Sequence, residues 1–88
     1  METNDKLRHQ IFEIIKNQIK ADDPPETNVT YKRLRALGYN DFETHQLIGQ
    51  CVSLELFHIL KHKETFNQNR YIKNLKHLPK EPKSLTHK

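Results

Sequence analysis

The stretch from Phe42 to Leu60 constrains the fold of this chain of 88 residues more than any other, because it is the longest apolar segment and has no turn signal inside it. A helix over residues 41–61 would point these apolar side chains in too many directions for one face to hold them. They are Phe42, Leu47, Ile48, Cys51, Val52, Leu54, Leu56, Phe57, Ile59 and Leu60. Such a helix has to be covered on several sides, by other helices of the chain or by a second copy in a homodimer.

The first two helices are predicted from apolar periodicity and from strong end signals. Residues 5–20 place apolar side chains at spacings of three, four and seven, the pattern of an amphipathic helix. Pro24 and Pro25 must end this helix, and because proline is tolerated in a first turn they also open the next one. Gly38 ends the second helix after Leu37, since glycine readily takes the left-handed conformation.

The third and fourth helices carry start signals of their own. Asn40 followed by Glu43 is typical of a capping box, in which each residue binds the backbone N–H of the other. Near Asn67, Phe66 precedes the expected cap and Tyr71 lies at the fourth helical position, which is the spacing of a hydrophobic staple. These signals predict helices that begin close to residues 41 and 67.

Together the helices predict a single all-α domain. We expect residues 1–79 to form a compact bundle of about four helices with a long central third helix. Residues 80–88 are polar and contain proline, so we expect a disordered tail there. The faces predicted to pack on the third helix are Ile11, Ile15 and Ile19, then Leu34 and Leu37, then Ile72 and Leu75.

Cysteine content and hydropathy bear on the location of the protein. The one cysteine, Cys51, excludes an intramolecular disulfide and favours a reducing compartment. No run of about 18 apolar residues occurs, and no apolar run follows a basic segment at the start. We therefore expect a cytoplasmic protein without membrane contact.

The basic charge is concentrated in the last third of the chain. Residues 61–88 hold eight Lys and Arg against two Glu, whereas residues 1–60 are slightly acidic. A solvated helix face with a basic tail explains this pattern, and so does a surface for nucleic acid or another polyanion. The residues predicted to contact a polyanion are Lys32, Arg33, Arg35, Arg70, Lys73 and Lys76.

A stripe of metal-ligand residue types follows one side of the predicted third helix. Cys51, Glu55, His58 and His62 are spaced by four, three and four residues, which places them on one narrow face. Zinc accepts all three side-chain types. The alternative interpretation is structural: a small buried cysteine, a glutamate paired with a nearby cation, and two surface histidines.

Histidines on other segments extend the metal hypothesis. His9 on the first helix and His45 in the first turn of the third could meet across the bundle, as ligands or in an interhelical hydrogen bond. The predicted metal-ligand set is therefore His9, His45, Glu55 and His58. We predict no cofactor other than a divalent metal in this alternative, and no catalytic residues.

Motifs along most of residues 9–79 resemble a family of small uncharacterised bacterial all-helical proteins, a domain of unknown function. The matching positions are His9, Asn17, Gln18, Asp23, Pro24, Pro25, Glu26, Thr30, Arg33, Leu34, Gly38, Tyr39, Glu43, His45, Ile48, Gly49, Glu55, Tyr71, Ile72, Leu75, Leu78 and Pro79. The resemblance implies a helical fold and bacterial origin, and it brings no established activity. Further histidines and a carboxylate are typical of that family where this chain has Phe12, Lys16, and Phe42 or Asp41, which puts a family metal site in doubt here.

Three functional hypotheses follow from the sequence. The first is a non-catalytic interaction or regulatory module with an unknown protein partner. The second is a metal-binding protein or metalloenzyme that uses the histidine and glutamate set. The third is a helical module that binds nucleic acid.

Overall fold

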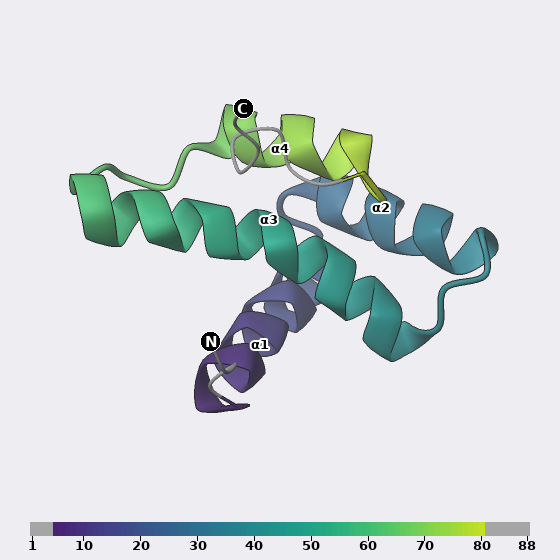
Figure 1. Cartoon of the computed structure of the whole chain (residues 1–88). Helices are drawn as coiled ribbons and strands as arrows, with labels where there is room; N and C mark the ends of the chain where they lie inside the picture. The colour runs from purple at the N-terminus through teal and green to yellow at the C-terminus, as the bar shows by residue number, and fades with distance from the viewer. Residues whose placement is uncertain (1–4, 81–88) are drawn as a thin grey trace.

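The computed structural model describes residues 5–80, and over this range the chain forms four α-helices around a long central one. They are α1 (Asp5–Ala21), α2 (Pro25–Ala36), α3 (Asp41–His62) and α4 (Gln68–His77). In Figure 1, α3 runs across the whole molecule, with α4 along one side and α1 crossing it on the other. The all-α prediction is confirmed, whereas nearly all of the predicted tail lies outside the described residues.

The helix ends follow the local signals in the sequence. Gly38 has φ of +111°, and the N–H of Tyr39 donates to the carbonyl of Leu34 at 3.2 Å, which closes α2 in a Schellman motif. Asn40 and Glu43 form the predicted capping box at the start of α3. Because each end satisfies its own backbone groups, the corner between α2 and α3 is fixed locally.

The core lies where α1, α2 and α4 contact α3. Its fully or nearly fully buried apolar residues are Ile11, Ile15, Leu34, Ile48, Cys51, Val52, Leu54, Tyr71, Leu75 and Leu78. The predicted packing of Leu37 is wrong, since its side chain is 60% exposed. Leu37 is the C-cap of α2, so its side chain does not lie on the buried face of that helix. On α4, Tyr71 is fully buried, whereas Ile72 is only half-buried.

A buried polar cluster joins three of the helices. The Tyr71 hydroxyl and the Thr27 hydroxyl both donate to Gln18 Oε1 at 2.7 Å, so α4 and α2 are tied to α1. Burial raises the pKa of Tyr71 to about 12, although its hydrogen bonds oppose that rise. Tyr71 therefore remains neutral and works as a structural donor.

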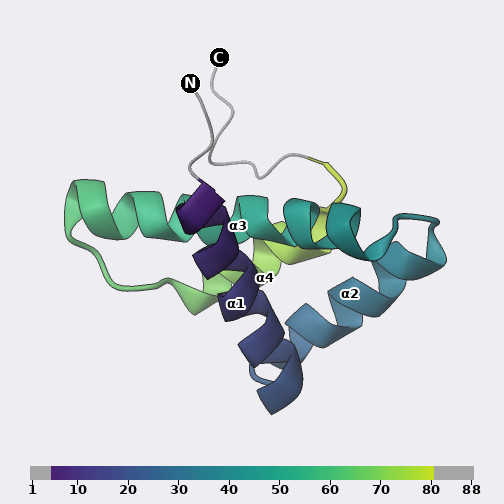
Figure 2. The same ribbon diagram turned by 90° about the horizontal axis from the view of Figure 1, so that it is seen from below.

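The crossing of α1 over α3 depends on a glycine. A Cβ atom at Gly49 would lie 3.3 Å from Ile11 Cγ2, which is tighter than ordinary packing contacts. Figure 2 shows α1 passing steeply across the middle of α3 at this level. A steep crossing leaves the last turns of α3 beyond the reach of α1, whereas Phe12 of α1 still contacts Phe42 at the start of α3. None of the helices in the described range is long and apolar enough to span a bilayer.

Candidate functional site

A surface groove of about 580 Å³ lies along α3 beside the first half of α1. It is lined by Leu7, Arg8, Ile11, Phe12, Tyr39, Glu43, Gln46, Leu47, Gly49, Gln50 and Ser53. Its volume falls within the usual range of ligand-binding clefts, and its lining mixes apolar side chains with a few polar groups that could orient a ligand. This groove is the candidate binding site.

The chain builds the groove from one close contact and one aromatic cluster. The contact of Ile11 with Gly49 brings α1 against α3. Phe12 packs edge-on against Phe42, with ring centroids 5.7 Å apart, and the guanidinium of Arg8 lies 5.8 Å from the Phe42 ring centroid. These contacts hold the first turns of α1 beside α3.

The charged residues of the groove already have structural partners. Arg8 pairs with Asp5 at 3.0 Å on the surface of α1. Glu43 Oε1 accepts from the backbone N–H of Asn40 at 2.9 Å in the capping box. The arrangement therefore suits recognition of apolar and amide groups better than recognition of a strong charge.

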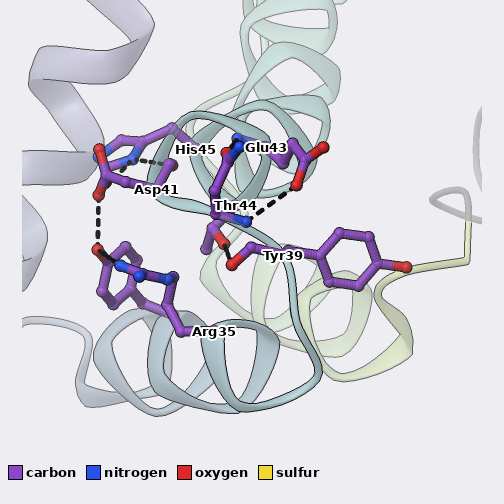
Figure 3. Close-up of polar contacts among 8 residues, drawn as sticks. Arg35, Tyr39, Asp41, Glu43, Thr44 and His45 are labelled. Carbon is purple, nitrogen blue, oxygen red and sulfur yellow. Dashed lines mark hydrogen bonds and ion pairs between the residues drawn. The ribbon is translucent and has the colours of Figure 1, made fainter.

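Asp41 joins α2 and α3 through polar contacts at the corner between them, as the close-up in Figure 3 shows. The Tyr31 hydroxyl donates to Asp41 Oδ1 at 2.5 Å and accepts from Arg35 Nη1 at 3.1 Å. The hydrogen bond from Tyr31 is the main reason that the pKa of Asp41 lies below its ordinary value. Asp41 therefore stays ionised at the positive end of α3, where a negative charge is favourable.

His45 lies buried behind this corner, with 4% of its surface exposed. Its Nδ1 atom is 2.9 Å from the carbonyl oxygen of Asp41, and its ring contacts Phe12 and Tyr31. Because a carbonyl oxygen only accepts, Nδ1 carries the proton in the neutral ring. The Nε2 atom is then left as an acceptor, and it is buried without a hydrogen-bond partner.

Glu55 lies fully buried near the other end of α3 and binds the start of α4. Arg70 donates to it through Nε at 2.6 Å and Nη2 at 3.0 Å, and the backbone N–H of Asn67 donates at 2.8 Å. Burial alone would raise the pKa of Glu55, but these hydrogen bonds and the Arg70 charge hold it below its ordinary value. Glu55 is thus a structural anion.

The structure does not bring the four predicted metal ligands together. His45, Glu55 and His58 all lie on α3, and Glu55 follows His45 by ten positions, which correspond to about 15 Å along the helix axis. His9 is exposed on α1, and Glu55 is occupied by Arg70. Across residues 5–80, no three His, Cys, Asp or Glu side chains form a group that could hold a metal ion.

The predicted stripe on α3 is divided between core and surface. Cys51 is fully buried, and burial followed by the negative charge of Glu55 raises the pKa of its thiol to about 12. A thiol that stays protonated is neither a good ligand nor a good nucleophile. His58 and His62 remain as neighbouring imidazoles on the last turns of α3, with ring centroids 5.4 Å apart.

The three predicted polyanion-binding arginines have partners within the protein. Arg33 donates to two carbonyl oxygens at the end of α4, at 2.8 and 2.9 Å, and so satisfies that helix terminus. Arg35 donates to Tyr31, and Arg70 holds Glu55. These side chains position helices.

The three predicted lysine contacts are exposed but lie on different helices. Lys73 and Lys76 share the outer surface of α4. Lys32 lies on α2, about 100° around the helix axis from Arg33, which faces α4. Of the six predicted cations, the three arginines thus bind other groups of the protein, and the three lysines are exposed on two different helices.

Gly49 is the signal in the sequence that could have located the groove. A glycine inside an apolar helical stretch often marks the close approach of another segment. The polar groove residues Gln46, Gln50 and Ser53 share one face of α3 by their spacing of four and three residues, but only the crossing of α1 places that face beside an apolar cleft. No protein-family model, curated protein or solved structure matches the chain.

Proposed function

We propose that this protein is a non-catalytic interaction module of the bacterial cytoplasm, with the groove between α1 and α3 as its docking surface. The observation that carries the proposal is the composition of the groove: apolar residues from both helices beside the uncharged Gln46, Gln50 and Ser53. An apolar segment of a protein partner, such as one face of an amphipathic helix, fits a cleft of this kind. Bacterial origin rests on the family resemblance of the sequence.

The other ionisable groups support binding over catalysis. The thiol of Cys51 is buried and protonated, and Glu55 is saturated by Arg70 and Asn67. Neither side chain lines the groove. The groove therefore offers surface and hydrogen bonds for recognition.

Site-specific photo-crosslinking in the cells that naturally make the protein tests this proposal. A photoreactive residue replaces Gln50 in the groove, and a matched variant carries it at Lys76, which is exposed on α4. We expect one defined adduct from position 50, at least tenfold stronger than any from position 76. A second substitution, Gln46→Trp, fills the groove and should abolish that adduct. Equal labelling from both positions, or an adduct unaffected by Gln46→Trp, would contradict the proposal.

We also propose that a second copy covers the exposed end of α3. Phe57 is 48% exposed and Leu60 is 81% exposed, and they lie one turn apart on the last turns of the helix. An apolar pair on a helix end favours symmetric association, because each copy can bury the pair of the other. Static light scattering of the full chain over a dilution series measures the mass.

The matched variants for this measurement are Leu60→Glu and Val29→Glu. Val29 is 64% exposed on α2, so its substitution adds the same charge away from α3. We expect a dimer for the natural chain and for Val29→Glu, and a monomer for Leu60→Glu. A monomeric natural chain at every concentration would overturn this part of the proposal.

A further inference from the structure

The end of α3 and the loop after it bring two histidines and a glutamate together. Lys63, the C-cap, has φ of +56°, so the chain turns back on the helix directly after His62. This turn places the carboxylate of Glu64 beside the last turns, with Glu64 Oε1 3.7 Å from His58 Nδ1. These three side chains are distant from the groove, which lies along the first half of α3.

The two imidazoles face each other at a separation that one metal ion can bridge. His58 and His62 are four residues apart, and their rings have centroids 5.4 Å apart with planes tilted by 35°. Two nitrogens on one tetrahedral zinc ion are about 3.3 Å apart, given bonds of about 2.05 Å. Rotation of the two rings about their side-chain bonds can bring one nitrogen of each ring to that nitrogen–nitrogen distance.

Phe57 restricts the two rings. Its ring lies edge-on to His58 at 5.6 Å and to His62 at 6.0 Å, measured between centroids. Side chains packed in this way lose less rotamer freedom when they bind a ligand, so the pair is partly preorganised.

The carboxylate of Glu64 lies on the Nδ1 side of the His58 ring. His58 Nδ1 is buried and has no hydrogen-bond partner, and it faces the Glu64 carboxylate. Metal-binding histidines commonly direct their second ring nitrogen at a carboxylate, which fixes the tautomer and leaves the other nitrogen for the ion. Arg70 also approaches Glu64, at 3.5 Å, but its charge is already compensated by Glu55.

We propose that His58 and His62 chelate one divalent late first-row transition ion through imidazole nitrogens, with Glu64 orienting His58 and water completing the coordination. Imidazole ligands favour Cu²⁺ and Zn²⁺, and Cu²⁺ binds tightest in the general order of affinities. The site uses two protein ligands, which agrees with the absence of any three-residue metal group within residues 5–80. It is separate from the groove and does not depend on binding there, and it shares only Phe57 with the proposed dimer surface.

Calorimetric titration of the untagged full chain with ZnCl₂, and separately with CuCl₂, tests the site. We expect one ion per chain, with Cu²⁺ bound more tightly than Zn²⁺. His62→Gln should weaken zinc binding at least tenfold, and the matched control His77→Gln should leave it unchanged, because His77 lies on α4 with Nδ1 beside a backbone carbonyl. His62 is exposed at a helix end, so its substitution leaves the fold intact.

Two further outcomes decide the assignment. Glu64→Gln should weaken zinc binding about tenfold, the usual effect of losing an outer carboxylate, and unchanged affinity would remove Glu64 from the site. NMR signals of the His58 and His62 rings should shift on zinc addition while that of His45 stays in place. No heat of binding, or equal affinity for the natural chain and His62→Gln, would overturn the proposal.

Discussion

The two halves of α3 are held in place by different means. The first half, residues 41–52, begins in a capping box and packs against α1 through Phe42, His45 and Gly49. The second half, residues 53–62, extends beyond the crossing with α1 and exposes apolar side chains at its end. Packing against α1 thus stabilises the first half, whereas the second half depends on its contacts with α4, including those of Glu55.

The buried ionisable group in each half shows the same contrast. Glu55 accepts three hydrogen bonds and an ion pair, and these contacts attach the start of α4 to α3. His45 makes one hydrogen bond and leaves Nε2 unpaired among aromatic rings. The first half of α3, which packs against α1, therefore tolerates a buried histidine with one unpaired nitrogen. The second half requires that both oxygens of the buried Glu55 carboxylate are hydrogen-bonded.

Removal of Arg70 should have the largest effect, because it leaves the Glu55 carboxylate buried without its countercharge. We expect Arg70→Met to lower the free energy of unfolding by about 3–5 kcal/mol, measured by urea denaturation. Arg8→Met, at an exposed pair with Asp5, should cost at most about 1 kcal/mol. The double variant Glu55→Leu with Arg70→Met should recover much of the loss, and equal costs for both arginines would contradict this contrast.

Acid titration should reveal Glu55 through the pH dependence of stability. Its pKa is lower in the folded protein than in the unfolded chain, so the folded state is stabilised at pH values above the unfolded pKa of about 4.3. That contribution should be lost as the pH falls through the lower, folded pKa. Thermal unfolding in acidic buffers should show a shallower pH dependence for Glu55→Gln than for the natural chain. Identical profiles would mean that Glu55 does not carry this effect.

Gly49→Val should have a smaller effect, located at the crossing of α1 and α3. The added side chain has to displace Ile11, whose Cγ2 would lie 3.3 Å from the new Cβ. We expect a loss of about 1–3 kcal/mol, typical of overpacking. Ser53→Val, at an exposed position on the same helix, is the control and should remain close to the natural stability. A neutral Gly49→Val would show that the crossing is loosely packed.

His45→Phe should have the smallest effect of the series. The change removes one hydrogen bond to the Asp41 carbonyl but also removes the unpaired Nε2 atom from an aromatic environment. These changes oppose each other, so we expect a difference within about 1 kcal/mol by urea denaturation. A loss as large as that of Arg70→Met would show that both halves of α3 depend on their polar contacts.

The sequence predicts best what is determined locally. Gly38, Asn40, Glu43 and Asn67 act within one turn of their own helix, and the structure has each end where the sequence places it. The partner of Glu55 could not be chosen in advance, because Arg70 lies fifteen residues away and several other cations are as close along the chain.

The groove was hidden from the sequence for a related reason. Its polar lining, including Gln46 and Gln50, forms one stripe on a helical wheel, which an ordinary solvated helix face would also show. It becomes a binding surface only because Gly49 lets α1 cross steeply at that point. The angle between two helices depends on the packing of many side chains, which apolar periodicity does not specify.

Hydrogen–deuterium exchange along α3 tests the division of this helix most directly. We predict strong protection of the backbone amides of residues 45–54 and much weaker protection of residues 58–62 in the natural chain. In Arg70→Met the weakly protected region should extend back to Glu55 and include the start of α4, while residues 45–52 keep their protection. Uniform protection along α3, or a uniform loss in the variant, would contradict the account, since α3 would then be a single cooperative unit.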